Sequence, residues 1–172
     1  MQFSTDDIEE GLRSLVAELV SVNAESTIHV VGGAAVALLV GREELTRDVD
    51  TLHNPSPAIG EAVKRVAHAK GWPETWLNDS AKMYDSHFHT EADWEPLIED
   101  NGVIVCIAGP KLLLAMKLLA GRGRRDETDI ERLLDTCEIS SLDEAIAVFD
   151  HYYPTEVIKS NAMRQLESRF SE

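Results

Sequence analysis

Two segments decide the fold, Ile28-His29-Val30-Val31-Gly32-Gly33-Ala34-Ala35-Val36-Ala37-Leu38-Leu39-Val40 and Thr46-Arg47-Asp48-Val49-Asp50-Thr51-Leu52. The β-branched run at 28–31 predicts a short strand, and the apolar run at 34–40 predicts a helix. The glycine pair between them predicts a turn, because glycine adopts backbone conformations that other residues avoid. Residues 48–52 predict a second strand. This order of strand, glycine turn, helix and strand indicates an α+β fold.

Asp48 and Asp50 are separated by one residue on the second predicted strand. Side chains alternate between the faces of a strand, so both carboxylates project the same way, about 7 Å apart along the backbone. A divalent cation relieves their repulsion and also binds substrate phosphates. Taken alone, the pair is more typical of solvent-facing acids on an edge strand than of a metal site. The glycine turn is equally ambiguous, since it suits either a phosphate at a helix N-terminus or a plain tight turn.

The glycine pair and the segment Thr46-Arg47-Asp48-Val49-Asp50 together resemble the minimal nucleotidyltransferases of the DNA polymerase beta superfamily. Lys117 within Leu112–Ala120, followed by Arg124–Ile130, is similar to the Lys and Arg-x-x-Asp motifs of abortive-infection-type nucleotidyltransferase toxins. Trp76–Asp79 and His151–Pro154 resemble a compact bacterial and archaeal branch of these enzymes. The resemblance covers the chain from about residue 28 to residue 155.

The resemblance implies a nucleotidyltransferase fold, a small mixed sheet with flanking helices and a C-terminal helical part. It also implies magnesium or manganese on Asp48 and Asp50. Lys117 would contact the triphosphate, and Asp126 would act near the nucleotide as the base that takes the acceptor proton, with Asp129 as its competitor. The implied nucleotide-binding residues are Gly32, Gly33, Thr46, Arg47, Lys117 and Asp129.

Simpler interpretations of the last three side chains stay open. Lys117 suits a lysine that extends to solvent from the end of an apolar helix. Asp126 and Asp129 suit the start of a helix, where the dipole favours acids. Each of these interpretations is as well supported by the sequence as the role in binding or catalysis.

The sequence departs from the superfamily pattern in two respects. Many members carry a third carboxylate on a neighbouring strand, whereas Val103–Ile107 contains none, so that Asp93 or Glu95 would have to substitute. A single magnesium ion is therefore expected rather than a two-metal arrangement. Ala34 follows the glycines, which leaves Thr46 as the hydroxyl that would reach a phosphate.

The length of 172 residues suits one core domain with a helical appendage, predicted as 1–108 and 109–172. Ser4 is expected to cap a first helix, and Asn101-Gly102 predicts a hairpin between strands at 94–98 and 103–107. Residues 72–93 have no clean period and are expected to be dominated by loops. Further helices are expected at 57–71, from Pro110 to Leu119, at 126–138, after Ser141 and at 155–170.

The formal net charge of −15 argues against a broad basic surface for nucleic acid. An RNA acceptor would need the local patch of Arg122, Arg124 and Arg125, although such a run is more often a solvated helix end than a binding site. No membrane span or secretory signal is recognisable, so we expect a cytoplasmic protein. Cys106 and Cys137 are expected to be free thiols, since they lie far apart in apolar segments.

Two further groups of residues are candidate sites. His87-Phe88-His89, among Asp85, Glu91 and Asp93, suits either a transition-metal site or a solvated loop. Trp72 and Trp76 suit either the wall of a base pocket or the edge of the core. The absence of Walker, Gly-x-Ser-x-Gly and paired Cys-x-x-Cys motifs removes the usual P-loop, hydrolase and zinc interpretations.

The predicted function is transfer of a nucleoside monophosphate from a nucleoside triphosphate to an acceptor hydroxyl. The acceptor would be an RNA 3′ end such as that of tRNA, a protein hydroxyl or a small molecule. The family resemblance adds the toxin of a toxin–antitoxin system, with a cognate antitoxin as partner. The alternative is a degenerate module that binds a nucleotide or a partner protein without turnover.

Overall fold

The computed structural model describes residues 1–41, 45–53 and 56–171, with the backbone alone at Arg125. The chain forms two compact units, one of Met1–Lys82 with Trp94–Ala108, the other of Met83–Asp93 with Gly109–Glu172. The predicted boundary after residue 108 coincides with one junction between the units. Residues 83–93, which the prediction assigned to the core, belong to the second unit. The division into a core of 1–108 and a helical part of 109–172 stays a prediction.

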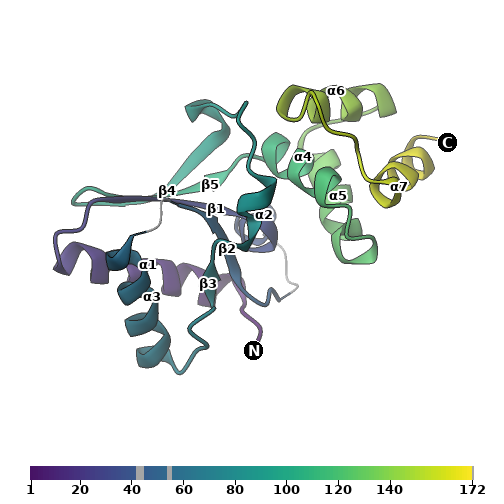
Figure 1. Ribbon diagram of the computed structural model, residues 1–172. Coiled ribbons are helices and arrows are strands. Elements are labelled where there is room, and N and C mark those ends of the chain that lie inside the picture. The colour runs from purple at the N-terminus through teal and green to yellow at the C-terminus, as the bar shows by residue number, and fades with distance from the viewer. Residues whose placement is uncertain (42–44, 54–55, 172) are drawn as a thin grey trace. The chain divides into compact units, whose positions relative to one another are not determined.

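The first unit is built on a mixed sheet, and the predicted α+β class is confirmed (Figure 1). In the described part of the chain the strand order is β3-β2-β1-β5-β4. β1 runs parallel to β5 and antiparallel to β2, β2 runs parallel to β3, and β4 runs antiparallel to β5. The elements are α1 (Thr5–Ser21), β1 (Ser26–Val31), α2 (Gly32–Val40), β2 (Val49–Leu52), α3 (Pro57–Lys70), β3 (Leu77–Asn78), β4 (Trp94–Asp100) and β5 (Val103–Ala108).

The two faces of this sheet differ in burial. Val30, Thr51 and Val105 lie on one face and are fully buried. α1 packs against α3 and also contacts β5 and β4. On the other face, the alternate residues His29 and Asp50 are only half-buried. The candidate catalytic acid of β2 therefore projects from the more open face.

The second unit is helical, with α4 (Pro110–Ala120) at its centre. Residues 112–119 of α4 are all buried, because the helix contacts α5, α6 and α7. Residues 83–93 are bound to the C-terminal end of α6: Tyr152 donates to Asp93 Oδ1 at 2.5 Å, and Ser86 donates to the Tyr152 carbonyl at 2.6 Å. The remaining elements are α5 (Arg124–Thr136), α6 (Leu142–Tyr152), α7 (Ser160–Phe170) and two short 3₁₀ helices, η1 (Ser80–Tyr84) and η2 (Glu91–Asp93).

Local sequence signals predicted several elements correctly. Ser4 caps α1 by accepting from the Asp7 N–H, and the Asp7 carboxylate accepts from the Ser4 N–H in return. Asn101 and Gly102 both have positive φ angles, 43° and 80°, as the predicted hairpin turn requires. Ser141 caps α6 by accepting from the Glu144 N–H at 3.3 Å. Each of these signals acts over a few residues, which is why the sequence alone revealed them.

Other boundaries differ from the prediction. α2 begins at Gly32 itself, so the glycine pair forms the first residues of the helix rather than a turn before it. α5 begins at Arg124, two residues early, and α7 begins at Ser160 rather than at 155. The N–H of Lys159 donates to the carbonyl of Leu118 in α4, a tertiary bond that holds this segment outside the helix. In the described part of the chain, no helix is long and apolar enough to cross a membrane.

Candidate active site

The carboxylate of Asp50 lies against the start of α2. Asp50 pairs with Val31, the last residue of β1, so the next residue, Gly32, comes directly beside it. A Cβ atom at Gly32 would lie 2.7 Å from Asp50 Oδ2, and the Gly32 φ of +67° is unfavourable for other residues. Position 32 therefore requires glycine, because a larger residue would separate the Asp50 carboxylate from the first turn of α2. The N-cap residue, Val31, supplies no side-chain cap to the N–H groups of this turn.

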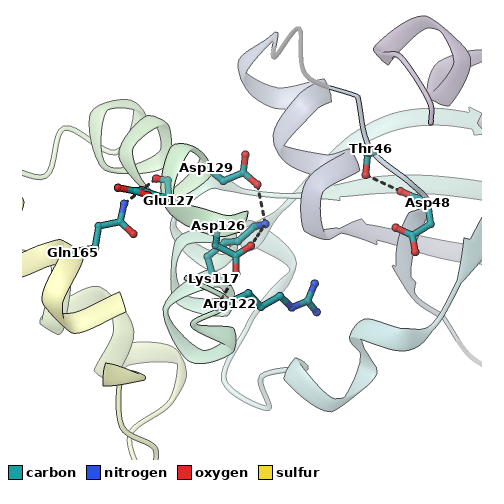
Figure 2. Close-up of polar contacts among 8 residues, drawn as sticks. All are labelled: Thr46, Asp48, Lys117, Arg122, Asp126, Glu127, Asp129 and Gln165. Carbon is teal, nitrogen blue, oxygen red and sulfur yellow. Dashed lines mark hydrogen bonds and ion pairs between the residues drawn. The ribbon is translucent and has the colours of Figure 1, made fainter. Parts of the chain in front are cut away.

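Asp48 is held at its carboxylate and at its backbone. Asn78 of β3 donates from Nδ2 to Asp48 Oδ2 at 3.3 Å. Thr46 donates from its hydroxyl to the Asp48 carbonyl at 3.1 Å, as Figure 2 shows. Thr46 is itself buried and forms two backbone hydrogen bonds with Phe3, whereas Arg47 is exposed. In this arrangement the Thr46 hydroxyl orients the loop before β2, and its contact with a phosphate stays a prediction.

Asn78 is a site residue to which the sequence analysis gave no role. It is paired with Asp50 in the register of β2 and β3, which puts Val31, Asp50 and Asn78 in one row across three strands. Its Oδ1 accepts from the Ser80 N–H at 2.9 Å, and its carbonyl accepts from the buried Thr51 hydroxyl at 3.1 Å. A two-residue strand has too short a pattern to be recognised. The family resemblance included Trp76–Asp79, but it assigned no role to Asn78.

The donor set of Asp48 and Asp50 fits one magnesium or manganese ion. Mg²⁺ prefers oxygen ligands and is commonly bound by one or two carboxylates, with phosphates and water completing the shell. Within residues 1–41, 45–53 and 56–171, no three His, Cys, Asp or Glu side chains are grouped as a metal site. Two carboxylates suit an ion of this kind, with the substrate and water completing its shell, and the single ion stays a prediction.

Neither candidate for the third acid forms a group of three with the pair. Glu95 lies on β4, which is separated from β2 by β5 and β1. Asp93 is engaged elsewhere, since it accepts from the Tyr152 hydroxyl and from the N–H and hydroxyl of Thr90. Burial raises the pKa of Asp93, but these hydrogen bonds outweigh burial and leave its pKa below the ordinary value.

The histidine segment at 87–89 also lacks a metal-binding arrangement. His89 Nε2 lies 3.4 Å from Asp85 Oδ1, and His87 is exposed. All of these residues lie in the described part of the chain, where no group of three candidate ligands occurs. Of the two interpretations of this segment, the structure favours the solvated loop.

In the second unit, Lys117 is buried between two acids. Its Nζ lies 2.8 Å from Asp126 Oδ1 and 2.8 Å from Asp129 Oδ2 (Figure 2). Both aspartates are 1% exposed and Lys117 is 9% exposed, so Lys117 does not extend to solvent. Asp126 Oδ2 also accepts from the Arg122 N–H at 3.1 Å. The resemblance thus selected three side chains that the structure brings into direct contact.

The three arginines of the predicted RNA patch are described to different extents. The Arg122 guanidinium lies over the Tyr84 ring, 5.5 Å from its centroid, in a cation–π contact. Arg124 is exposed at the first residue of α5. The side chain of Arg125 lies outside the described part of the chain.

The two tryptophans lie at the edge of the core. Trp76 is 0% exposed and donates from Nε1 to the Val63 carbonyl at 3.1 Å. Trp72 is half-buried and packs edge-on against Trp76 and Phe3. A Cβ atom at Gly11 of α1 would lie 2.7 Å from the Trp72 ring. Of the two interpretations, these contacts favour the edge of the core over the wall of a base pocket.

His53 follows β2 and is half-buried. Its Nδ1 lies 2.8 Å from the Thr51 hydroxyl, whose oxygen also lies 3.1 Å from the Asn78 carbonyl. Burial lowers the pKa of His53 below its usual value, with a smaller opposite effect from Asp79. The ring is accordingly neutral at pH 7.

Comparison with known proteins gives one informative match. No family model matches the sequence, and no curated protein matches it. A solved structure of an antigenic nucleotidyltransferase-like protein from Paracoccidioides brasiliensis is similar, with a TM-score of 0.52, 16% sequence identity and 100% coverage of both chains. At this identity the likeness shows the fold alone. The chain therefore has a nucleotidyltransferase-like fold, and it holds Asp50 beside the start of α2.

Proposed function

We propose that this protein transfers a nucleoside monophosphate from a nucleoside triphosphate to an acceptor hydroxyl. The observation that carries the proposal is the position of the Asp50 carboxylate directly beside Gly32, the first residue of α2. A carboxylate at the N-terminus of a helix juxtaposes a cation ligand with backbone N–H groups that favour phosphate. A metal–triphosphate complex needs a ligand for the cation and N–H donors for the phosphates close to each other.

Asp48 and Asp50 would hold magnesium or manganese, which supplies neutralisation of the triphosphate charge when bound. The N–H groups of α2 would hold phosphate oxygens. The acceptor oxygen forms a bond to the α-phosphorus as the bond from that phosphorus to its bridging oxygen breaks. Pyrophosphate leaves with the electron pair, and the acceptor proton passes to a base, for which Asp126 or Asp129 is proposed. Catalysis would rest on positioning and charge.

Lys117 is proposed to contact the triphosphate, as the resemblance implies. A lysine ammonium has three N–H donors, and Asp126 and Asp129 engage two of them. Contact with a phosphate would use the third donor or replace one carboxylate. Substitution of Lys117 should then raise the KM for the triphosphate, in addition to any effect on stability.

The acceptor class is proposed to be RNA, with a toxin role and a basic antitoxin as partner. The net charge of −15 opposes polynucleotide binding, so the local arginines would have to supply the contact. Replacing Arg122 and Arg124 by Gln should abolish transfer to RNA but leave triphosphate binding intact. Transfer to a protein or a small molecule would be unaffected by these changes.

The test is incubation of the pure protein with magnesium and each α-labelled nucleoside triphosphate, alone and with total RNA. The wild type is compared with Asp48→Asn plus Asp50→Asn, which preserves side-chain shape. The matched control is Glu74→Gln plus Glu99→Gln, which removes the same charge from exposed positions. Label transferred by the wild type and the control, but not by the aspartate variant, would support the proposal and identify the acceptor.

Binding of a triphosphate without transfer to any acceptor would overturn the catalytic claim. The degenerate binding module would then replace it, an alternative favoured by the lack of a third acid beside the pair in the described residues. Co-purification of a small basic protein would add the partner-binding role.

A further inference from the structure

We infer that Asn78 is a positioning residue that holds Asp48 for a single divalent cation. The inference rests on the proposed function, because it concerns the cation of the same site. It goes beyond that function by assigning a role to a side chain that is neither a catalytic acid nor a proposed ligand.

The orientation of the Asn78 amide is determined by its neighbours. Oδ1 accepts from the Ser80 N–H at 2.9 Å, and Nδ2 donates to Asp48 Oδ2 at 3.3 Å. Rotating the amide by 180° would place two N–H donors together and would put an oxygen against a carboxylate. Only the observed orientation satisfies both neighbours, so Asn78 presents an N–H to Asp48.

The backbone of Asn78 is fixed as well. Its carbonyl accepts from the hydroxyl of Thr51, which is 0% exposed, and its register partner on β2 is Asp50. The amide is thus anchored to the strand that carries the second carboxylate. A donor anchored in this way limits rotation of Asp48 and leaves Oδ1 of Asp48 as the oxygen for a cation. Such outer partners of metal ligands typically affect metal affinity about 10–100-fold.

Asn78 also limits the charge of the site. A neutral amide occupies the position beside Asp50 where a carboxylate would supply a third negative charge. Two carboxylates balance one divalent cation, whereas a second cation would add charge that no described group of three acids offsets. The site is therefore built for one ion, with the substrate completing its shell.

The experiment measures binding of Mn²⁺ by the electron paramagnetic resonance of the free ion. Titrations are done at physiological ionic strength, with and without a non-hydrolysable α,β-methylene triphosphate. Binding by Asp48→Asn plus Asp50→Asn is subtracted to remove ions on the acidic surface. The matched control is Thr75→Ala, an exposed position on the same loop. Thermal unfolding of every variant is recorded without metal.

We expect one site-dependent Mn²⁺ per wild-type chain. Asn78→Ala should raise its Kd about tenfold, while Thr75→Ala leaves the Kd unchanged. Asn78→Asp retains the acceptor for Ser80 and adds an oxygen ligand, so it should lower the Kd about threefold or more. This second variant keeps the test decisive if Asn78→Ala does not fold. If Asn78 had a purely structural role, both variants would unfold at a lower temperature, and their Kd values for Mn²⁺ would not change in opposite directions.

Each of two results would overturn one part of this inference and leave the other part standing. A wild-type Kd in both Asn78 variants would remove the positioning role, and two site-dependent ions in the wild type would remove the single-cation claim. No site-dependent Mn²⁺ under either condition would overturn both this inference and the metal of the proposed function. If Mn²⁺ binding follows the expectation but no label is ever transferred, only the proposed catalysis fails.

Discussion

At the scale of single residues, Gly32 shows how one missing side chain creates the candidate site. Its φ is +67°, and a Cβ atom added to it would lie 2.7 Å from Asp50 Oδ2, so both backbone and space exclude larger residues. The sequence indicated a glycine requirement here, but it attributed the requirement to a turn. The structure attributes it to the contact of a helix start with a carboxylate.

Gly32→Ala should lower the free energy of unfolding by about 1–3 kcal/mol and displace Asp50, because the added methyl group clashes with the carboxylate and the φ angle is strained. Urea denaturation gives the first effect, and Mn²⁺ binding gives the second. Gly60→Ala is the control: a Cβ at Gly60 of α3 meets nothing within 4 Å, so this variant should be slightly more stable. Equal Mn²⁺ affinity in Gly32→Ala and the wild type would contradict the contact.

His53 predicts a pH dependence of stability. Its folded pKa lies below the ordinary value of 6.5, because burial disfavours the charged ring. The unfolded chain takes up the proton first as the pH falls, so stability is full above pH 6.5 and decreases as the pH falls through the folded pKa. His53→Gln should therefore reduce the fall of the unfolding free energy as the pH drops below 6.5. His87→Gln, at an exposed position, should keep the wild-type slope; identical slopes in all three proteins would exclude this role.

At the scale of secondary-structure elements, Lys117 joins α4 to α5. The ammonium on α4 contacts Asp126 and Asp129, one helical turn apart on α5, and all three side chains are buried. Two carboxylates and one ammonium leave a net negative charge in the interior, which is costly unless every partner is retained. Gln165 of α7 also donates to the Glu127 carbonyl at 2.8 Å, so α5 is held on two sides.

Lys117→Met should destabilise the protein by about 3–5 kcal/mol, because it leaves two buried carboxylates without their cation. Adding Asp126→Asn and Asp129→Asn should restore most of the loss by removing the unpaired charges. Urea midpoints at pH 7 measure both changes, with Lys111→Met, an exposed lysine of the same helix, expected within about 0.5 kcal/mol of the wild type. If the triple variant were less stable than Lys117→Met alone, the electrostatic explanation would be wrong.

At the scale of the whole molecule, the division into units does not follow the order of the sequence. Residues 83–93 lie between β3 and β4 in the chain but belong to the second unit. Tyr152 and Tyr153 explain why, since Tyr152 donates to Asp93 and Tyr153 donates to the Tyr84 carbonyl. Burial raises the pKa of both tyrosines, so each hydroxyl keeps its proton as a donor at neutral pH.

The fragment 1–108 should fold by itself, because it contains all strands of the described sheet with α1, α2 and α3. The fragment 109–172 should be largely unfolded alone, because it lacks the partners of Tyr152 and Tyr153. Circular dichroism and urea denaturation of the two fragments and the full chain test this. A cooperative transition in 109–172 would show that residues 83–93 are dispensable for the helical part.

The two groups of candidate residues were reached from the sequence in different ways. Asp48, Asp50 and Gly32 were proposed from local rules of strand alternation and glycine conformation, although β2 begins only at Val49, and their roles stay predictions. Asn78 received no role, since its hydrogen bond to Asp48 joins residues 30 positions apart. The roles of Lys117, Asp126 and Asp129 came from a family resemblance, and their contact in the structure leaves those roles to be tested.

The sequence by itself determined the features that depend on neighbouring residues: the capped start of α1, the hairpin at Asn101-Gly102 and the succession of β1, glycine pair, α2 and β2. Steric limits and hydrogen bonds within a few residues are sufficient for these. The tertiary structure decided the register of β3, the burial of Trp76 against Trp72, and the unit to which 83–93 belongs. These depend on contacts between distant segments, whose free energies emerge only once the whole core is packed.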